Sequence, residues 1–273
     1  MKVILSRKGF DSSNGGYPSP ILPDGTMLSL PIPDDIGLGY SEIQYNGVTY
    51  SEIISQLTNG KFKKEICHLD PDIRPDLRTT PAENWSPAFG QVHSAQGVLR
   101  NAKVEIGDIF LYFGWFRKTI ERENGYNYLT RKDSDDFYDI SDLHAIYGYM
   151  QIGEIITDKE EIKKYSWHPH SFSHYNEDNS NNALYLPAKR LSFAPNLPGY
   201  GTFAYDKKYV LTAENKTRSN WVYKPFYAPE NVCGTRKNCA KETDKYIQYN
   251  GIWQELVLDE SPELINWIYS LFE

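Results

Sequence analysis

The densest group of chemically active side chains lies in the stretch HLDPDIR and continues to Arg78. A histidine, two aspartates and an arginine occupy alternate positions: His68, Asp70, Asp72 and Arg74. Pro71 and Pro75 prevent a regular helix or a central strand, so these side chains would project from a stiff, extended segment. An imidazole and carboxylates at this spacing can hold a divalent cation or pair an acid with a base. One face supplies at most two metal ligands, so a metal site would need a partner such as Asp11 or Asp24; a run of surface ion pairs is the alternative.

A second group follows a short apolar run at Val3 to Ser6, which we predict to be a buried strand. Two cations, Arg7 and Lys8, come directly after it, and Gly9 and Asp11 follow. The cations can bind phosphate, while Asp11 can act as a base or a ligand. The stretch has neither glycine spacing of the familiar phosphate-binding loops, and the chain has no GxSxG elbow of a serine hydrolase.

The third group is WHPH, in which Pro169 separates His168 from His170. The fixed proline backbone points the two imidazoles in different directions. They are equally a metal-ligand pair or one wall of a base-stacking pocket, and isolated histidines are also common as structural residues.

Two predicted strands would position these groups: GDIFLYFGWFR, residues 107–117, and LHAIYGYMQIGEIIT, residues 143–157. Both are rich in β-branched and aromatic residues and lack proline, so they should be buried neighbours in one sheet. Glycines inside both strands predict a curved, barrel-like sheet. Three side chains would lie at or near its rim: Trp115, Arg117 and Gln151.

The rest of the chain predicts short helices, short strands and long loops. Residues 7–34 are rich in Gly, Pro, Ser and Asp but also apolar, which favours an ordered loop folded onto the core. Residues 89–101 form a helix or helix-like turn, from which Gln91 and Gln96 could face a pocket. Further helices are expected at 51–57, after Asp158 and at 262–272, and further strands at 61–67 and 183–193. We also expect a hairpin-like passage at 199–211 and a surface excursion at 121–142. The predicted fold is α+β, a single domain over 1–273 with its barrel-like core around 104–157.

Composition limits the classes of function. A net charge of −7 argues against a long, sequence-independent grip on duplex nucleic acid, although a local basic pocket is compatible with it. The three cysteines, Cys67, Cys233 and Cys239, complete neither a disulfide framework nor a zinc site, which favours a reducing cytosol. No apolar run is long enough for a signal peptide or a membrane span, so we expect a cytoplasmic protein without a membrane partner.

Several long motifs, in this order, resemble the third nucleotide-modification-associated domain family of bacteria and phages. They are SRKGFDSSNGGYPSPILPDGTMLSLPIPD, HLDPDIR, FGQVHSAQG, GDIFLYFGWFR, IYGYMQIGEI and WHPH. The resemblance runs from the first residues to about Trp221. It implies a role linked to modified nucleotides or to base modification in nucleic acid, without a defined reaction. The matching positions are Arg7, Lys8, Asp11, His68, Asp70, Asp72, Arg74, Gln91, Gln96, Arg117, Gln151 and His168.

The paired stretches GDIFLYFG and IYGYMQIGEI also resemble strands of barrels in the broad PUA-like group. Several members of that group hold a flipped or modified base in an aromatic pocket. This resemblance would place Trp115, Arg117 and Gln151 where a base edge is read.

We therefore expect an enzyme that acts on a nucleotide or a nucleobase, including a base flipped out of nucleic acid. Asp11, His68 and Asp70 would be acid, base or metal ligands, and a divalent metal is the one cofactor that the residue types suggest. The substrate would contact the remaining candidates, Arg7, Lys8, Asp72, Arg74, Gln91, Gln96, Trp115, Arg117, Gln151 and His168. The alternative is a non-catalytic reader or sponge of modified bases or signalling nucleotides. Either function requires the amino-terminal segment and HLDPDIR to meet over the mouth of the barrel in one cavity.

Overall fold

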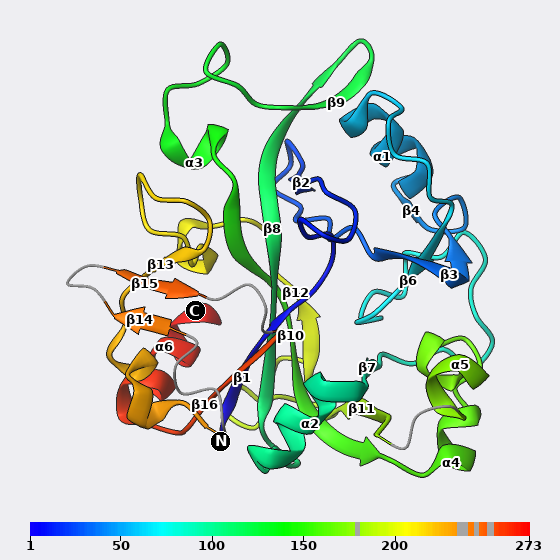
Figure 1. Cartoon of the computed structure of the whole chain (residues 1–273), viewed down its shortest axis with the longest axis vertical. Coiled ribbons are helices and arrows are strands. Elements are labelled where there is room, and N and C mark those ends of the chain that lie inside the picture. Colours follow the sequence, from blue (N-terminus) through cyan, green and yellow to red (C-terminus); the bar gives the residue numbers. More distant parts are fainter. Residues whose placement is uncertain (178–180, 234–239, 243–245, 250–253) are drawn as a thin grey trace.

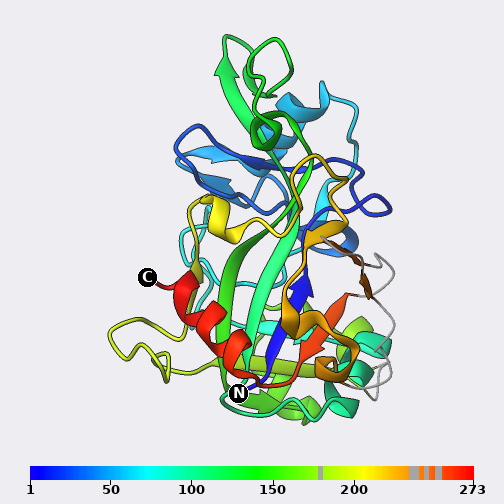
Figure 2. The ribbon, with the colours of Figure 1, turned by 90° about the vertical axis from the view of Figure 1, so that its left-hand side faces the viewer.

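Two long strands form the centre of the molecule (Figure 1). The computed structural model describes residues 1–177, 181–233, 240–242, 246–249 and 254–273, so Cys239 lies outside the described residues. Strand β8 (Ile109–Arg122) pairs antiparallel with β10 (Leu143–Ile156), as predicted from their composition. Both strands run along the long axis, with α1 (Tyr50–Thr58) and β9 (Gly125–Tyr128) at one end and α2 (His93–Asn101) toward the other (Figures 1 and 2).

The main sheet continues on both sides of this pair in the order β16-β1-β8-β10-β11-β7. Strand β1 (Val3–Arg7) lies parallel to β8 and antiparallel to β16 (Glu255–Leu258). On the other side, β11 (Ala183–Pro187) joins β10 to the edge strand β7 (Phe89–Gln91). Short strands extend the sheet at its rim: β2 (Ser19–Ile21) and β9 pair with β8, and β12 (Tyr200–Thr202) pairs with β10.

The sheet curls into a half-barrel, as the strand glycines predicted. The register of β10 shifts between Ile146 and Gly148, and a Cβ at Gly148 would lie 2.8 Å from Ile73 Cδ1. This register shift is a β-bulge, which bends the strand, and glycine fits the crowded position because it has no side chain. The curl brings the two edge strands together. Across the gap between them, Gln91 Nε2 of β7 donates a hydrogen bond of 2.7 Å to Glu255 Oε1 of β16. We call the place where β7 approaches β16 and β1 the seam.

Two large apolar clusters make up most of the core, and a third, minor one lies around Ile162 and Leu184. The larger one is built on β1, β8, β10 and β16, and the smaller one on α1 and the amino-terminal loop. Cys67 and Cys233 are buried free thiols. The remaining elements are short: β3 (Ile32–Gly39), β4 (Gln44–Tyr45), β5 (Val48–Thr49), β6 (Ile66–His68), α3 (Phe137–Ile140), α4 (Lys159–Lys163), η1 (Pro169–Ser171), α5 (Ser173–Asn176), η2 (Lys207–Tyr209), β13 (Asn220–Val222), η3 (Pro225–Tyr227), η4 (Pro229–Asn231), β14 (Ala240–Glu242), β15 (Tyr246–Tyr249) and α6 (Pro262–Leu271).

The predicted helices at 51–57, after Asp158 and at 262–272 are confirmed as α1, α4 and α6. A capping box of Thr49 and Glu52 begins α1, and the Asp158 carboxylate accepts the first-turn N–H groups of α4. Several predictions were too coarse. The strand expected at 183–193 ends at Pro187, and the hairpin-like passage expected at 199–211 consists of β12, η2 and connecting loops. The strand expected at 61–67 is only Ile66–His68, residues 89–101 divide into a strand and a helix, and residues 121–142 include β9 and α3. In the described part of the chain, no helix combines the length and the apolar character that crossing a lipid bilayer requires.

Candidate functional site

A polar cavity of about 490 Å³ opens at the seam. Its walls come from β1 and the loop after it, from the end of β6, from the β7–α2 junction and from η1 and α5. Six of the residues singled out from the sequence line it: Arg7, Lys8, Asp11, His68, Asp70 and Gln91. The expected meeting of the amino-terminal segment with HLDPDIR is therefore present.

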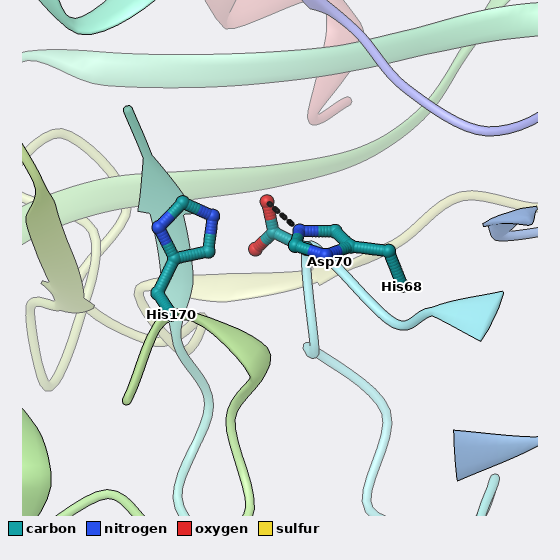
Figure 3. Close-up of side chains that lie close together, drawn as sticks. All are labelled: His68, Asp70 and His170. Atoms are coloured by element: carbon teal, nitrogen blue, oxygen red, sulfur yellow. Dashed lines mark ion pairs between the residues drawn. The ribbon is translucent and has the colours of Figure 1, made fainter. Parts of the chain in front are cut away.

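His68, Asp70 and His170 form a cluster in this cavity, with one possible ligand atom from each lying within 4.8 Å of the others. The Asp70 carboxylate lies between the two imidazoles (Figure 3), and its Oδ2 is 4.0 Å from His68 Nε2. A third ligand was expected from Asp11 or Asp24. Instead it is His170 that joins the pair, while Asp24 accepts a hydrogen bond from Tyr45.

Asp70 is anchored through one of its oxygens. Oδ1 accepts a 2.8 Å hydrogen bond from the Gly90 N–H and lies 3.2 Å from His168 Nε2. Burial by itself would raise the pKa of Asp70, but the hydrogen bond from His168 and the nearby His168, His170 and Lys8 outweigh it and hold the pKa well below its usual range. Asp70 is therefore a carboxylate whose Oδ2 faces the cluster.

His170 is held by Asn182. Its Nδ1 lies 2.7 Å from Asn182 Oδ1, and the Asn182 amide nitrogen donates to the His170 backbone oxygen at 2.9 Å. Burial lowers the pKa of His170 to about 3, against the opposing effect of Asp70. The ring packs where Gly90 has no side chain, since a Cβ there would lie 2.2 Å from His170 Cγ. His170 is thus neutral, and its position depends on a glycine in β7.

His68 is oriented by Asp34, at the start of β3. His68 Nδ1 lies 3.3 Å from Asp34 Oδ2, which also accepts a 2.7 Å hydrogen bond from the Tyr175 hydroxyl. Burial would raise the pKa of Asp34, yet the hydrogen bonds from His68 and Tyr175 hold it well below its usual range. A carboxylate that accepts from one imidazole nitrogen directs the other nitrogen, here toward Asp70.

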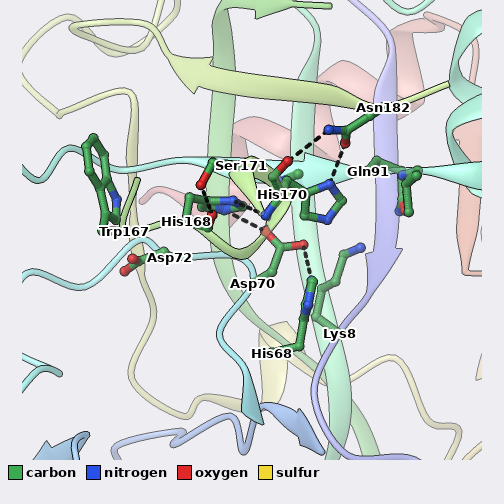
Figure 4. A network of polar contacts seen from close by, with 12 residues as sticks. Lys8, His68, Asp70, Asp72, Gln91, Trp167, His168, His170, Ser171 and Asn182 are labelled. Atoms are coloured by element: carbon green, nitrogen blue, oxygen red, sulfur yellow. Dashed lines mark hydrogen bonds and ion pairs between the residues drawn. The ribbon is translucent and has the colours of Figure 1, made fainter. Parts of the chain in front are cut away.

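His168 lies behind the cluster and is fully buried. Its Nδ1 accepts the His170 backbone N–H at 3.3 Å, and its Nε2 faces Asp70 Oδ1 (Figure 4). The sequence placed His168 among the substrate-binding residues. The structure places it outside the cavity lining, where it orients Asp70 and His170.

The two cations, Arg7 and Lys8, also line the cavity, and Lys8 is close enough to Asp70 to lower its pKa. Arg7 lies 3.4 Å from Asp11 Oδ2, and Asp11 Oδ1 accepts the N–H groups of Ser13 and Asn14. Lys8 Nζ lies 3.4 Å from the buried Glu255 carboxylate and 4.2 Å from the centre of the Phe89 ring.

The amino-terminal turn of α2 also lines the cavity, through Val92, His93, Ser94 and Ala95. Val92 precedes the helix and its side chain makes no capping hydrogen bond. The first N–H groups of a helix have no partner within the helix, so those of α2 are open to a ligand in the cavity. His93 has a φ of +56°, a conformation uncommon for residues other than glycine and often associated with functional sites.

Three predicted residues lie close to the cavity but do not line it. Asp72 forms a buried ion pair of 2.6 Å with Arg78 and accepts from Trp85 Nε1. Arg74 pairs with Asp76 at 2.6 Å, and Gln96 accepts from the Tyr185 hydroxyl at 2.9 Å. Each has a structural partner in place of an open face toward the cavity.

The expectation that the same cavity holds Trp115, Arg117 and Gln151 is wrong. Gln151 pairs with Ile109, so it lies eight positions along β8 from Arg117, about 26 Å away at about 3.3 Å per residue. The Gln151 amide is bound to Gly107 and Ser192 in a separate hollow. Arg117 donates to the Leu129 oxygen, and the Arg218 guanidinium lies 4.0 Å from the centre of the Trp115 ring.

Sequence reasoning missed several residues of the site. His170 was noticed in WHPH but was not assigned to the site, and Asp34 ends the loop whose first motif was singled out. Glu255 and Asn182 carried no signal, because a single polar residue next to a short strand is common. They become recognisable only when the sheet curls.

Comparisons with known proteins give one match. The sequence model of a family described as Nucleotide modification associated domain 3 matches residues 2–259. The match passes well beyond Trp221, where the resemblance was expected to end, and includes β16 with Glu255. No curated protein and no solved structure matched.

Proposed function

The chain belongs to the family described as Nucleotide modification associated domain 3, and on this premise we propose that it is an enzyme acting on a nucleotide or a flipped nucleobase. The observation that carries the proposal is the composition of the seam cavity. Its lining brings the cations Arg7 and Lys8 and the first turn of α2 together with the cluster of His68, Asp70 and His170. Such a cavity can hold an anionic group and carry out chemistry beside it.

In this proposal the phosphate of the substrate lies against the first turn of α2, beside Arg7 and Lys8. Helix N–H groups and guanidinium groups are the usual partners of phosphate oxygens. Asp11 and Glu255 hold the two cations in place before a substrate arrives. The overall charge of −7 favours a single nucleotide or an extruded base over a long nucleic-acid tract.

The polar character of the cavity favours an enzyme over a reader. Readers hold a base between aromatic rings, whereas the described lining contains one phenol, Tyr175, and neither Phe nor Trp. It contains three imidazoles, His68, His93 and His170, together with the Asp11 and Asp70 carboxylates. Convergent titratable groups in a cleft are typical of catalytic sites.

The test is a panel of ribo- and deoxynucleotides with standard and modified bases. Binding is followed by calorimetry and products by mass spectrometry. We expect Arg7→Gln to weaken binding about tenfold or more, since a hydrogen bond to a charged group contributes about 1.5–3 kcal/mol. Asp70→Asn should abolish turnover with little change in binding, while Asp76→Asn, a matched change in the same segment, should alter neither.

Two outcomes contradict the proposal. Binding of a nucleotide without any product, unchanged in Asp70→Asn, would identify a reader. Absence of binding across the panel and across oligonucleotides that present an unpaired base would remove the nucleotide from the cavity altogether.

A further inference from the structure

We propose that His68, Asp70 and His170 bind one divalent transition-metal ion, with its remaining coordination positions open to the seam cavity. The ligand atoms come from two separate parts of the chain: the end of β6 with the loop directly after it, and η1. They converge on one point in the cavity wall. This inference goes beyond the proposed function and is tested without any nucleotide.

The positions of the hydrogen atoms show why a cation fits. Asn182 Nδ2 donates to the His170 backbone oxygen, so the Asn182 oxygen faces His170 Nδ1, and that nitrogen must carry its hydrogen. The remaining nitrogen, Nε2, therefore has a free electron pair. When the His68 ring is neutral and its hydrogen is on Nδ1, which faces Asp34 Oδ2 at 3.3 Å, the electron pair lies on His68 Nε2.

Asp70 adds a third electron pair. The Gly90 N–H donates to Oδ1, and His168 Nε2 lies 3.2 Å from the same oxygen, since His168 Nδ1 already accepts the His170 N–H. Oδ2 lies 4.0 Å from His68 Nε2, a separation too long for a hydrogen bond. Three electron pairs that face one another repel unless a positive ion lies between them, and a metal ion satisfies all three at once.

The supporting contacts match those of known metal sites. Ligating histidines usually donate their other N–H to a carboxylate or a carbonyl oxygen, as His68 does to Asp34 and His170 to Asn182. Metal–ligand bonds of about 2.1 Å place ligands about 3–3.5 Å apart, so atoms now within 4.8 Å would draw together by about 1 Å on binding.

The ligand types select the class of ion. Two imidazoles and one carboxylate suit Zn²⁺, Mn²⁺, Fe²⁺ or Co²⁺, whereas Mg²⁺ and Ca²⁺ prefer oxygen ligands throughout. Three protein ligands leave at least one position for water or substrate, which is the arrangement of catalytic sites and not of structural ones. Arg7 and the first turn of α2 line the same cavity as the three ligands.

The experiment uses the full chain, freed of metal by a chelator. Zn²⁺, Mn²⁺ and Co²⁺ are titrated separately at pH 7.5 by calorimetry, with an elemental analysis after desalting. We expect one tightly bound ion per chain and a higher melting temperature with the ion. Bound Co²⁺ should show the absorption of nitrogen and oxygen ligands without a thiolate band, which excludes Cys67, Cys233 and Cys239 as the ligands.

Substitutions locate the site. His170→Gln and Asp70→Asn should each weaken binding at least a hundredfold, while His93→Gln, a matched change in the same cavity, should leave the stoichiometry at one. Circular dichroism verifies the fold of each variant, and the cobalt spectrum of the unaltered chain gives the ligand type even where a variant fails to fold. The inference is overturned if the unaltered chain binds none of the ions, if a thiolate band appears, or if folded His170→Gln binds as tightly as the unaltered chain. A nucleotide-processing activity that survives complete metal removal would leave the proposed function standing without the metal.

Discussion

Gly90 shows how one residue without a side chain determines the position of a reactive one. A Cβ at this position would overlap the His170 ring, with a contact of 2.2 Å to Cγ. The same residue donates its N–H to Asp70. Two of the three cluster residues therefore depend on the backbone of a single residue in β7.

We predict that Gly90→Ala displaces the His170 ring and abolishes tight binding of Co²⁺. Gly97→Ala is the matched control, because a Cβ there would have only an ordinary contact at 3.8 Å with Asn181 and alanine favours the helix. Calorimetric titration with Co²⁺ measures both variants. If Gly90→Ala binds Co²⁺ as tightly as the unaltered chain, the position of the His170 ring is not required for metal binding.

His144 is a buried histidine that does not line the cavity, and it makes folding sensitive to pH. Its Nδ1 accepts a 3.0 Å hydrogen bond from Trp221 Nε1. Burial, assisted by Arg218 and Arg7, holds the pKa of His144 well below its ordinary value, so the folded protein keeps it neutral. In the unfolded chain, His144 takes up a proton near pH 6.5. Its contribution to the free energy of unfolding is therefore fully present above that pH and is lost as the pH falls below it.

We predict that His144→Gln, which keeps an acceptor for Trp221, reduces this loss between pH 6.5 and pH 5. One fewer proton taken up on unfolding lowers the slope of the free energy of unfolding against pH by about 1.4 kcal/mol per pH unit. Urea unfolding at several pH values measures this slope. His170 contributes in the same direction and is unchanged in the variant, so some pH dependence should remain. Equal slopes in both proteins would show that His144 does not titrate as argued.

At the scale of elements, Asp72 holds the HLDPDIR segment in place together with Asp70, which is itself bound to the Gly90 N–H. Asp72 is fully buried, its backbone pairs with Ala88, and its carboxylate binds Arg78 at 2.6 Å. Burial raises the pKa of Asp72, although Arg78 opposes the shift. The alternation of charges along the segment thus separates two tasks: Asp70 faces the cavity and Asp72 anchors the backbone beside it.

We predict that Arg78→Met lowers the free energy of unfolding by about 3–5 kcal/mol, because it leaves a buried carboxylate without its partner. Arg74→Met is the control in the same segment. Its partner Asp76 is largely exposed, so the loss should be about 1 kcal/mol or less. Urea denaturation compares the two, and equal losses would contradict an anchoring role for Asp72.

At the scale of the whole molecule, β8 joins the two apolar clusters. It pairs with β1 and β10 in the larger cluster and with β2 and β9 beside the smaller one. The seam cavity lies where segments from both clusters meet, with His68 from one side and Gln91 and Glu255 from the other. We infer that the two clusters fold as one unit, because separating them would divide the cavity.

We predict that Leu57→Ala, in the smaller cluster, and Leu264→Ala, in the larger one, both destabilise the same unfolding transition. Each removes a buried side chain and should cost about 2–5 kcal/mol. Tryptophan fluorescence and far-UV circular dichroism in urea should give coincident curves for both variants. Separate transitions, each moved by only one of the two substitutions, would show two independent units.

The sequence by itself determined the local structure and the types of chemistry. Alternating apolar residues gave the central strand pair, and Asp158 and the apolar spacing after Pro262 gave two helices with their starts, because these signals act within a few residues. The three chemical groups, near Arg7, His68 and His168, were also visible, since their residue types are unusual at that density.

Tertiary structure alone decided which of these groups meet. Gln151 and Arg117 looked like neighbours on one rim until the antiparallel register placed Gln151 beside Ile109, the first residue of β8 and eight positions from Arg117. His170 joined His68 and Asp70 across about a hundred residues of chain, and Glu255 reached Gln91 only because the sheet curls and β16 pairs with β1. Local propensity carries no information on such contacts, because strand register and sheet curvature result from packing of the whole core.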